Sequence, residues 1–204
     1  MLEQLLPFLT ASVLLTLSPG PDIIYVLVQG MTNGWRHGFV TALGLVTGIV
    51  VHTTLVAFGV SAVIQRSDSI FLAVKVLGAA YLFYLAYKVY KGDSTIQMST
   101  GGVIKRTYTS LFKQGLLMNV LNPKVAIFFL AFFPGFLWEP EGNTVLQFYI
   151  LGFLFMLQAL LIFSMVAVLS GRISRYLTSH RNSGAVFKWV QVLVFLGIGL
   201  FILF

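Results

Sequence analysis

The chain contains no cysteine among its 204 residues. Disulfide bonds, thiolate metal sites and cysteine nucleophiles are therefore excluded. Charge is also scarce, because Asp, Glu, Lys and Arg together make up 9% of the residues, against roughly 25% in an average soluble domain. Hydrophobic residues reach 58%, and a chain so poor in charge could not keep its surface in water. The composition predicts a membrane protein.

The few polar residues lack the groupings that enzymes and metal sites need. The sequence holds three His and six Asp or Glu, with no phosphate-binding loop, no metal-ligand spacing and no pairing of a nucleophile with a base. The net charge of +7 could suggest nucleic acid as a partner. The basic residues flank apolar runs, however, where they orient membrane proteins. We expect no enzyme activity, no metal, no cofactor and no nucleic-acid partner.

Apolar residues form six long runs separated by short polar segments. Each run is near or above the ~18 residues that cross a bilayer as a helix. The runs are continuously apolar, whereas the strands of a membrane β-barrel alternate apolar and polar residues. We therefore predict an all-α membrane protein with six transmembrane helices, forming one transporter-like domain over residues 1–204. The runs are Leu5–Val28, Gly38–Ile64, Ile70–Tyr90, Ser110–Leu137, Thr144–Leu169 and Phe187–Phe204.

Lys and Arg gather in alternate loops, and this sets the orientation. The positive-inside rule places the basic loops in the cytoplasm. We expect a multi-pass protein of the bacterial inner (plasma) membrane with both termini outside the cytoplasm. The polar segment Gly92–Thr109 is expected to be a cytoplasmic linker between halves 1–91 and 110–204. The residues assigned to the cytoplasmic side are Arg36, Lys88, Lys91, Lys105, Arg106, Lys113, Arg172, Arg175, Arg181 and Lys188.

The two halves of the chain share features in the same order. Pro19 and Pro21 interrupt the first run, and Pro123 interrupts the fourth. The segment Leu77–Leu82 also resembles Leu196–Phe201. A three-helix repeat must be inverted, because an odd number of crossings turns the second copy upside down. Such repeats are typical of secondary transporters, so we expect two inverted three-helix repeats with helices 1 and 4 broken at mid-membrane.

An acidic residue follows the first interruption. Pro19 and Pro21 have no backbone N–H, and Gly20 has no side chain, so the helix should break here. Backbone groups freed by the break must be satisfied by protein or by water in a cavity, because lipid offers no partner. Asp22 then has two open interpretations. It caps the amides of a new half-helix, or it binds a substrate ammonium or a coupling proton.

The second interruption carries a basic residue and two amides. Lys124 follows Pro123 at the place that matches Asp22, so it either pairs with Asp22 across the repeat axis or extends to the cytoplasmic surface. Asn119 and Asn122 flank the break. An asparagine amide offers donors and an acceptor, which suits either the broken backbone or the carboxylate of an amino acid. We expect at least one of the two to bond the backbone.

Further polar and small residues lie deep in the other runs. His52 either packs with a hydrogen bond or carries a proton, since its titration range suits a relay. Tyr81 is deep enough to line a site, although core packing competes with that role. Gly44 and Gly48 have the spacing of small residues at close helix contacts. Glycine faces of this kind serve packing within one chain and also permit a homodimer.

Together these motifs resemble the LysE/RhtB family of amino-acid exporters over essentially the whole chain. The match is to the homoserine/threonine-type branch. In the basic-amino-acid branch the Asp after the second proline is typically missing, so Asp22 argues for neutral substrates. The residues that carry the resemblance are Ser18-Pro19-Gly20-Pro21-Asp22, Gly34-x-x-x-Gly38, Gly44 to Gly48 with His52, Gly59, Lys75-x-x-Gly78-Ala79-Ala80-Tyr81-Leu82 and Asn119-x-x-Asn122-Pro123-Lys124.

The resemblance implies secondary active export of neutral amino acids or close analogues of the homoserine, threonine or leucine kind, by proton-coupled antiport. The partners would be the amino acid, protons and the lipid bilayer. Two alternatives stay open: efflux of a cation or another small solute on the same scaffold, and a non-transporting membrane accessory protein. The expected substrate- and proton-binding residues are Asp22, Pro19, Gly20, Pro21, Asn119, Asn122, Pro123, Lys124, His52 and Tyr81.

Overall fold

The computed structural model of the protein describes residues 2–60, 68–92, 106–139, 142–179 and 183–203. Within these ranges the chain is almost entirely helical and contains no strand. Four helices are long and apolar enough to cross a membrane, and two bent helix pairs raise the number of spans to six when each pair is counted as one. The predicted all-α membrane fold is confirmed.

The first three spans differ in their regularity. The first consists of α1 (Leu2–Leu17) and α2 (Pro21–Asn33), which meet at a bend of 57°. The second is α3 (Trp35–Leu55), which continues as a π-helix, η1 (Val56–Val60). The third is the uninterrupted α5 (Asp68–Lys91). The break predicted for the first helix is therefore present, and it lies between Leu17 and Pro21.

The fourth span is the most irregular. It begins with α6 (Tyr108–Val120), bends by 48°, and resumes as α7 (Pro123–Ile127). It then runs through a π-helix, η2 (Phe128–Phe132), into a 3₁₀ turn, η3 (Phe133–Phe136). The break predicted at Pro123 is thus confirmed. The π-helical turns were not predicted, because no residue pattern marks them.

The fifth and sixth spans are α8 (Thr144–Ser179) and α9 (Ser183–Leu203). With 36 residues, α8 is about 54 Å long and extends beyond the predicted end at Leu169. Arg172 and Arg175, predicted in a loop, therefore lie on this helix. The prediction was wrong because the continuous apolar pattern ends before the helix does, and no proline follows it to stop the helix.

The predicted linker Gly92–Thr109 is described only at its ends. Residues 93–105, including Lys105, lie outside the described residues, as does Arg181. The last two residues of the predicted linker are helical, because α6 begins at Tyr108. The hydroxyl of Thr107 accepts a hydrogen bond of 3.3 Å from the backbone N of Ser110 and so caps this helix.

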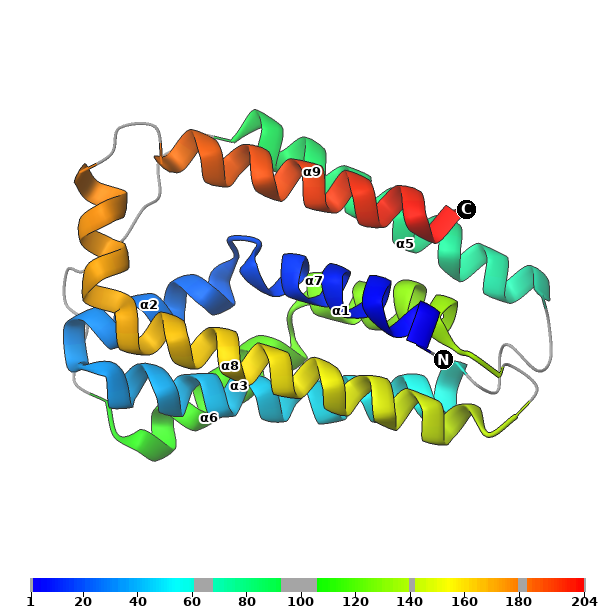
Figure 1. Cartoon of the computed structure of the whole chain (residues 1–204), viewed down its shortest axis with the longest axis horizontal. Helices are drawn as coiled ribbons and strands as arrows, with labels where there is room; N and C mark the ends of the chain where they lie inside the picture. The colour runs from blue at the N-terminus through cyan, green and yellow to red at the C-terminus, as the bar shows by residue number, and fades with distance from the viewer. Residues whose placement is uncertain (1, 61–67, 93–105, 140–141, 180–182, 204) are drawn as a thin grey trace.

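The helices pack in two groups with α1 and α7 between them (Figure 1). On one side α5 and α9 lie against each other, and on the other α3 packs against α2, α6 and α8. A Cβ on Gly44 would collide with the carbonyl oxygen of Phe112, and one on Gly115 with that of Thr41. The close approach predicted for this glycine face therefore joins α3 to α6. Corresponding helices of the two halves pack in pairs, but their inverted relation stays a prediction.

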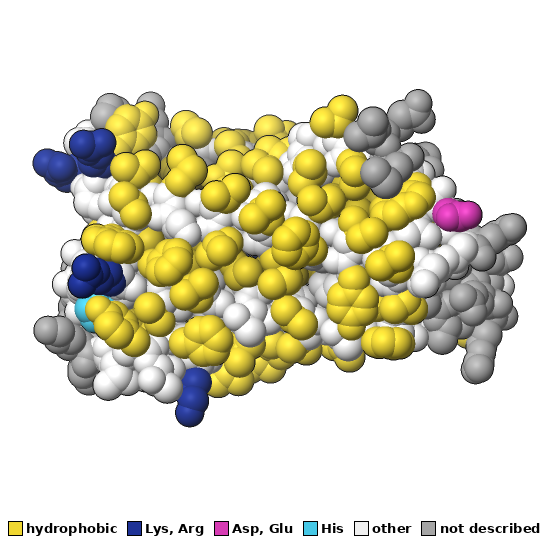
Figure 2. All heavy atoms as spheres, turned by 60° about the horizontal axis from the view of Figure 1, so that its bottom comes forward, with side chains coloured by type: hydrophobic (Ala, Val, Ile, Leu, Met, Phe, Trp, Pro, Cys, Tyr) yellow, Lys and Arg dark blue, Asp and Glu magenta, His cyan; other side chains and the backbone are white. Residues whose placement is uncertain are grey.

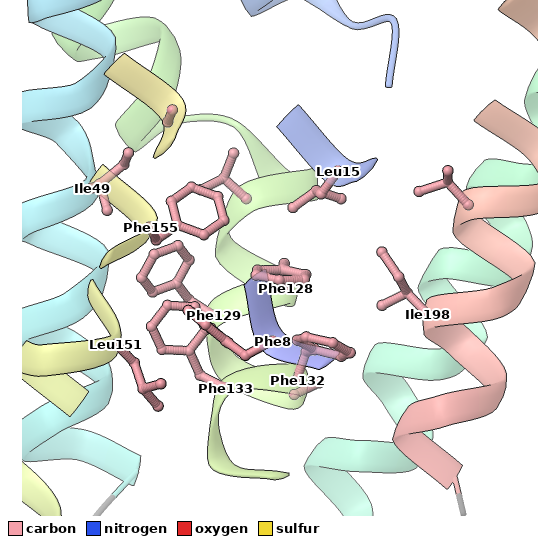
Figure 3. Packing of buried hydrophobic residues seen from close by; sticks show 14 of the residues in the cluster. Phe8, Leu15, Ile49, Phe128, Phe129, Phe132, Phe133, Leu151, Phe155 and Ile198 are labelled. Carbon is pink, nitrogen blue, oxygen red and sulfur yellow. The ribbon is translucent and has the colours of Figure 1, made fainter. Parts of the chain in front are cut away.

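A cluster of phenylalanine rings fills the space beside the breaks (Figure 3). The rings of Phe128, Phe129 and Phe133 contact Phe8 from α1 or Phe155 from α8. Phe129 and Phe133 stack with their ring centres 4.0 Å apart. Aromatic contacts of this kind add packing energy beyond the area they bury. The cluster fixes η2 and η3 against the first and fifth spans.

Hydrophobic side chains cover most of the face shown in Figure 2, while Lys and Arg gather at one end. At this basic end, side chains near the ends of different helices contact one another. Lys188 Nζ donates a hydrogen bond of 2.8 Å to the carbonyl of Gly92, and the ring of His37 lies 4.9 Å from that of Tyr108. Both chain termini lie at the opposite end (Figure 1). The apolar surface is the one that lipid would cover.

Candidate functional site

At the first break, the backbone between α1 and α2 is not helical and lies next to Lys124. Pro21 is the first residue of α2, where its fixed φ suits a helix start. Gly20 precedes it with an extended backbone (φ −157°) that any residue could adopt. What favours glycine here is space, because a Cβ would lie 3.2 Å from Lys124 Nζ. The Pro19–Pro21 segment thus leaves room for a side chain from the other half of the chain.

The second break is closed by an asparagine. Asn122 is the residue before α7, and its Oδ1 accepts a hydrogen bond of 3.0 Å from the backbone N of Lys124. Pro123 takes the first helical position. The predicted bonding of the broken backbone by an asparagine is therefore confirmed at Asn122.

Asp22 faces this second break. The residue is 7% exposed, and its Oδ2 accepts a hydrogen bond of 2.8 Å from Asn122 Nδ2. Its Oδ1 is buried and has no hydrogen-bond partner among the described residues. The Asp22 side chain therefore bonds to the other half of the chain and not to the amides of its own helix, although it lies in the first turn of α2, where a negative charge is favourable. A buried carboxylate oxygen without a partner is costly and is open to a ligand.

Lys124 binds the end of the first half-helix. Its half-buried side chain carries Nζ to the carbonyls of Leu15 and Ser18, at 3.2 and 3.3 Å. Carbonyls in the last turn of a helix have no partner in that helix, and a cation is favourable there. Lys124 thus does not extend to the surface. Its amine bonds these carbonyls. The backbone N of Lys124 bonds Asn122, and Asn122 in turn bonds Asp22.

Both charged residues line one cavity, which has about 370 Å³ of space between atoms including its opening. Its wall comes from the first, second, fourth and fifth spans, so residues from both halves of the chain meet there. One part of the wall is polar and the rest is apolar. The polar part comprises Thr16, Ser18, Gly20, Asp22, Asn119 and Lys124, and the apolar part Leu15, Ile23, Ile49, Val125, Phe155, Ala159 and Phe163.

His52 lies behind this wall and Tyr81 lies apart from it. The Nε2 atom of His52 is 3.1 Å from the carbonyl oxygen of Asn119, and the imidazole is 4% exposed. The Oδ1 of Asn119 is buried and has no hydrogen-bond partner in the part of the chain that the structure describes. These contacts fit the hydrogen-bonded packing role for His52. Tyr81 contacts Tyr84 on α5, with ring centres 6.1 Å apart, and is not among the residues lining the cavity.

A second polar group, which was not predicted, lies at the cavity wall. Thr16 of α1 accepts a hydrogen bond of 3.0 Å from Gln158 Nε2 of α8. Ser12, one helical turn before Thr16, is also fully buried. Two hydroxyl residues four positions apart in an apolar run were the available signal, because that spacing puts both on one face of the helix.

The cavity combines a carboxylate and an ammonium with an otherwise mostly apolar wall. Such a site suits a small molecule that carries both charges and a short uncharged group. The described residues contain no group of three or more His, Cys, Asp or Glu side chains that could hold a metal ion.

Comparisons with known proteins identify the family. The model for the LysE type translocator matches residues 13–204. The homoserine/homoserine lactone efflux proteins of Salmonella typhi and Salmonella typhimurium are each 30% identical over 183 residues, 89% of this chain and 87% of theirs. The membrane protein YrhP of Bacillus subtilis is 28% identical over 98% of both chains. No solved structure matches. The chain belongs to the LysE type translocator family and is a membrane transporter rather than an enzyme.

Proposed function

We propose that the protein is a secondary active exporter of neutral amino acids or close analogues, driven by exchange for protons. The observation that carries the proposal is the pair of charges at the two breaks. Asp22 has a carboxylate oxygen without a hydrogen-bond partner among the described residues, and Lys124 has an ammonium, and both residues line one cavity. An α-amino acid carries the complementary charges on one carbon atom.

The positions of the two charges allow one orientation of a bound amino-acid zwitterion. Its ammonium would bind Asp22 Oδ1, and its carboxylate would face Lys124 or the free amides at the start of α2. Burying two charges is costly unless both are paired, which is why a site for amino acids needs both partners. The remaining wall is largely apolar, so it favours a substrate whose side chain is uncharged.

Asp22 also supports exchange for protons. A proton and a substrate ammonium compete for the same carboxylate, since the neutral acid no longer attracts a cation. Release of the substrate outside would then be followed by protonation of Asp22 and return of the site to the inside. Competition of two ligands for one site is the basic requirement of antiport.

The positions of the breaks support alternating access. In secondary transporters, broken helices of two inverted repeats hold the substrate, and one repeat moves against the other. Here α3 packs with α8 and α5 with α9, which are corresponding helices of the two halves. The basic end of the molecule (Figure 2) would face the cytoplasm of the inner membrane, with both termini outside. The relatives named as homoserine/homoserine lactone efflux proteins agree with this substrate class.

The test is transport by the purified protein in proteoliposomes with an imposed pH gradient. A panel of radiolabelled neutral, basic and acidic amino acids should show uptake of one or more neutral members, abolished by a protonophore. Movement of basic amino acids or of metal cations alone would contradict the proposal and favour another solute. The absence of any flux, from protein that is folded by circular dichroism, would favour the accessory role.

A further inference from the structure

The pair formed by α5 and α9 is covered only in part by the rest of the molecule. Of the most apolar 18 residues in each helix, 22% are buried in α5 and 33% in α9, against 56% in the second span. The two helices lie beside each other at one edge of the molecule (Figure 1). Because the other described helices leave the outer faces of this pair open, lipid covers them.

Aromatic rings and lysines from both helices gather at the basic end of this pair. The ring centres of Tyr90 on α5 and Trp189 on α9 lie 5.8 Å apart, and both residues are more than half exposed. Lys188 Nζ lies 5.7 Å from the centre of the Tyr90 ring, and Lys91 Nζ lies 5.2 Å from that of Tyr87. We call these five residues the aromatic–lysine cluster.

The two ammonium groups of the cluster carry charge that the described residues do not neutralise. Neither lysine forms an ion pair with a described carboxylate. Lys188 Nζ donates one of its three hydrogens to the carbonyl of Gly92, which leaves two for a ligand. On the face shown in Figure 2, the basic side chains lie at one end and the acidic ones at the other. The cluster is therefore able to bind an anion.

An exposed apolar strip runs along α9 from the cluster toward the middle of the membrane. Its residues follow Trp189 at steps of four and three positions, which puts them on one face of the helix. Their exposed fractions range from 37% to 64%. Between Trp189 and Leu203 the helix rises about 21 Å, which is enough to cross the ~15 Å of hydrocarbon in one leaflet. The strip consists of Leu193, Leu196, Leu200 and Leu203.

We propose that the aromatic–lysine cluster and this strip bind an anionic phospholipid of the cytoplasmic leaflet, such as phosphatidylglycerol. Lys91 and Lys188 pair with the phosphate, and an acyl chain lies along the leucine strip. The rings of Tyr90 and Trp189 pack at the level of the headgroup, where aromatic residues are favourable. Basic sites between helix ends at the cytoplasmic surface suit anionic lipid headgroups. The inference goes beyond the proposed function and does not depend on transport.

The test is thermal unfolding of the purified protein in detergent with added lipid. Dioleoylphosphatidylglycerol has a net negative charge, whereas dioleoylphosphatidylcholine has the same chains and a choline that cancels the charge of its phosphate. At saturation the first should raise the unfolding temperature of the wild type by at least about 3 °C, and the second by clearly less. The double variant Lys91→Gln/Lys188→Gln should lose this difference. Inorganic phosphate, which has no acyl chain, should give no shift, and a shift equal to that of the lipid would contradict the role of the strip.

The matched control is the double variant Arg106→Gln/Lys113→Gln. It removes two positive charges from the same end of the molecule, but both residues are exposed at α6, in the other group of helices. This variant should keep the wild-type preference for phosphatidylglycerol. An equal loss of the preference in both double variants would show that the whole basic end attracts anions, and would overturn the site.

Native mass spectrometry gives a second readout that does not depend on stability. From an equimolar mixture of the two lipids, the wild type and the α6 variant should retain one molecule of phosphatidylglycerol, and Lys91→Gln/Lys188→Gln should retain none. Trp189→Ala keeps both charges but removes a ring and should weaken the retention. Equal retention of the two lipids by the wild type, or unchanged retention by the lysine variant, would overturn the inference.

Discussion

Asn122 donates a hydrogen bond of 2.8 Å to the carboxylate of Asp22, from a position 100 residues further along the chain. The bond connects the break of the fourth span to the break of the first. The other end of the same carboxamide accepts from the backbone of Lys124 and so starts α7. One side chain therefore fixes the two breaks relative to each other, and a movement that separates them must break its bond to Asp22.

The two roles of Asn122 can be separated by substitution. Asn122→Ser should keep the helix cap, because serine caps well, but its shorter side chain should lose the bond to Asp22. We expect efflux to fall at least fivefold with little change in the unfolding temperature. Asn122→Ala should lose both, with an additional loss of about 1 kcal/mol in stability. Efflux and thermal unfolding of the two variants check this.

Thr107→Ala serves as the control for the loss of a cap. It removes the hydrogen bond that starts α6 and leaves the cavity intact. It should lower stability like Asn122→Ala while efflux persists. If Asn122→Ser transports at the wild-type rate, the bond between the breaks has no role in transport.

A substitution at Gly20 tests whether the position of the Lys124 amine matters for transport. A methyl group at Gly20 would lie 3.2 Å from Nζ and would push the amine away from the carbonyls of Leu15 and Ser18. Because the backbone of Gly20 is extended, Gly20→Ala should insert and fold, and its transport rate should fall. Gly59→Ala, where a Cβ meets no atom of the described residues within 4 Å, should transport normally. Equal rates for both variants would show that the position of the amine does not matter.

The contact between α3 and α6 predicts a stability effect that is independent of substrate. Gly44→Ala would force a methyl group into the carbonyl of Phe112, and overpacking of this kind typically costs about 1–3 kcal/mol. The unfolding temperature in detergent should therefore fall. Gly197→Ala, where no atom of the described ranges lies within 4 Å of the added Cβ, should leave the unfolding temperature unchanged. An equal response of the two variants would contradict the packing of these helices.

The absence of cysteine makes the orientation directly measurable, because a single introduced thiol is the only one in the chain. Thr32 is exposed near the C-terminal end of α2, which lies at the basic end of the molecule, and Asn143 is exposed just before α8. We expect Asn143→Cys to react with a membrane-impermeant maleimide in intact cells. Thr32→Cys should react only after permeabilisation. The reverse pattern would overturn the proposed orientation.

The fold was largely predictable from the sequence because the bilayer sets the length of each apolar run and proline sets the breaks. The bounds of α8 were not, because the helix continues to Ser179, beyond the end of the apolar run at Leu169. The π-helical turns at Val56–Val60 and Phe128–Phe132 were also not predictable. They depend on how neighbouring spans pack and not on any local residue pattern.

The site was predictable in part. The prolines marked the breaks, and the matched positions of Asp22 and Lys124 suggested that these residues approach each other. The sequence could not show that Asn122 would take the bond to Asp22, because partners across 100 residues depend on tertiary packing. The hydrogen bond between Gln158 and Thr16 could not be predicted for the same reason, since the two residues are 142 positions apart in the chain.

The most direct test of the central claim is the removal of one charge. Asp22→Asn keeps the size of the side chain and loses the carboxylate that would bind the ammonium and the proton. We expect the variant to insert and unfold like the wild type, while proton-driven efflux falls at least tenfold. Glu139→Gln makes the same chemical change at an exposed residue and should transport normally. Wild-type efflux by Asp22→Asn, with the same dependence on the pH gradient, would contradict a substrate and proton site at Asp22.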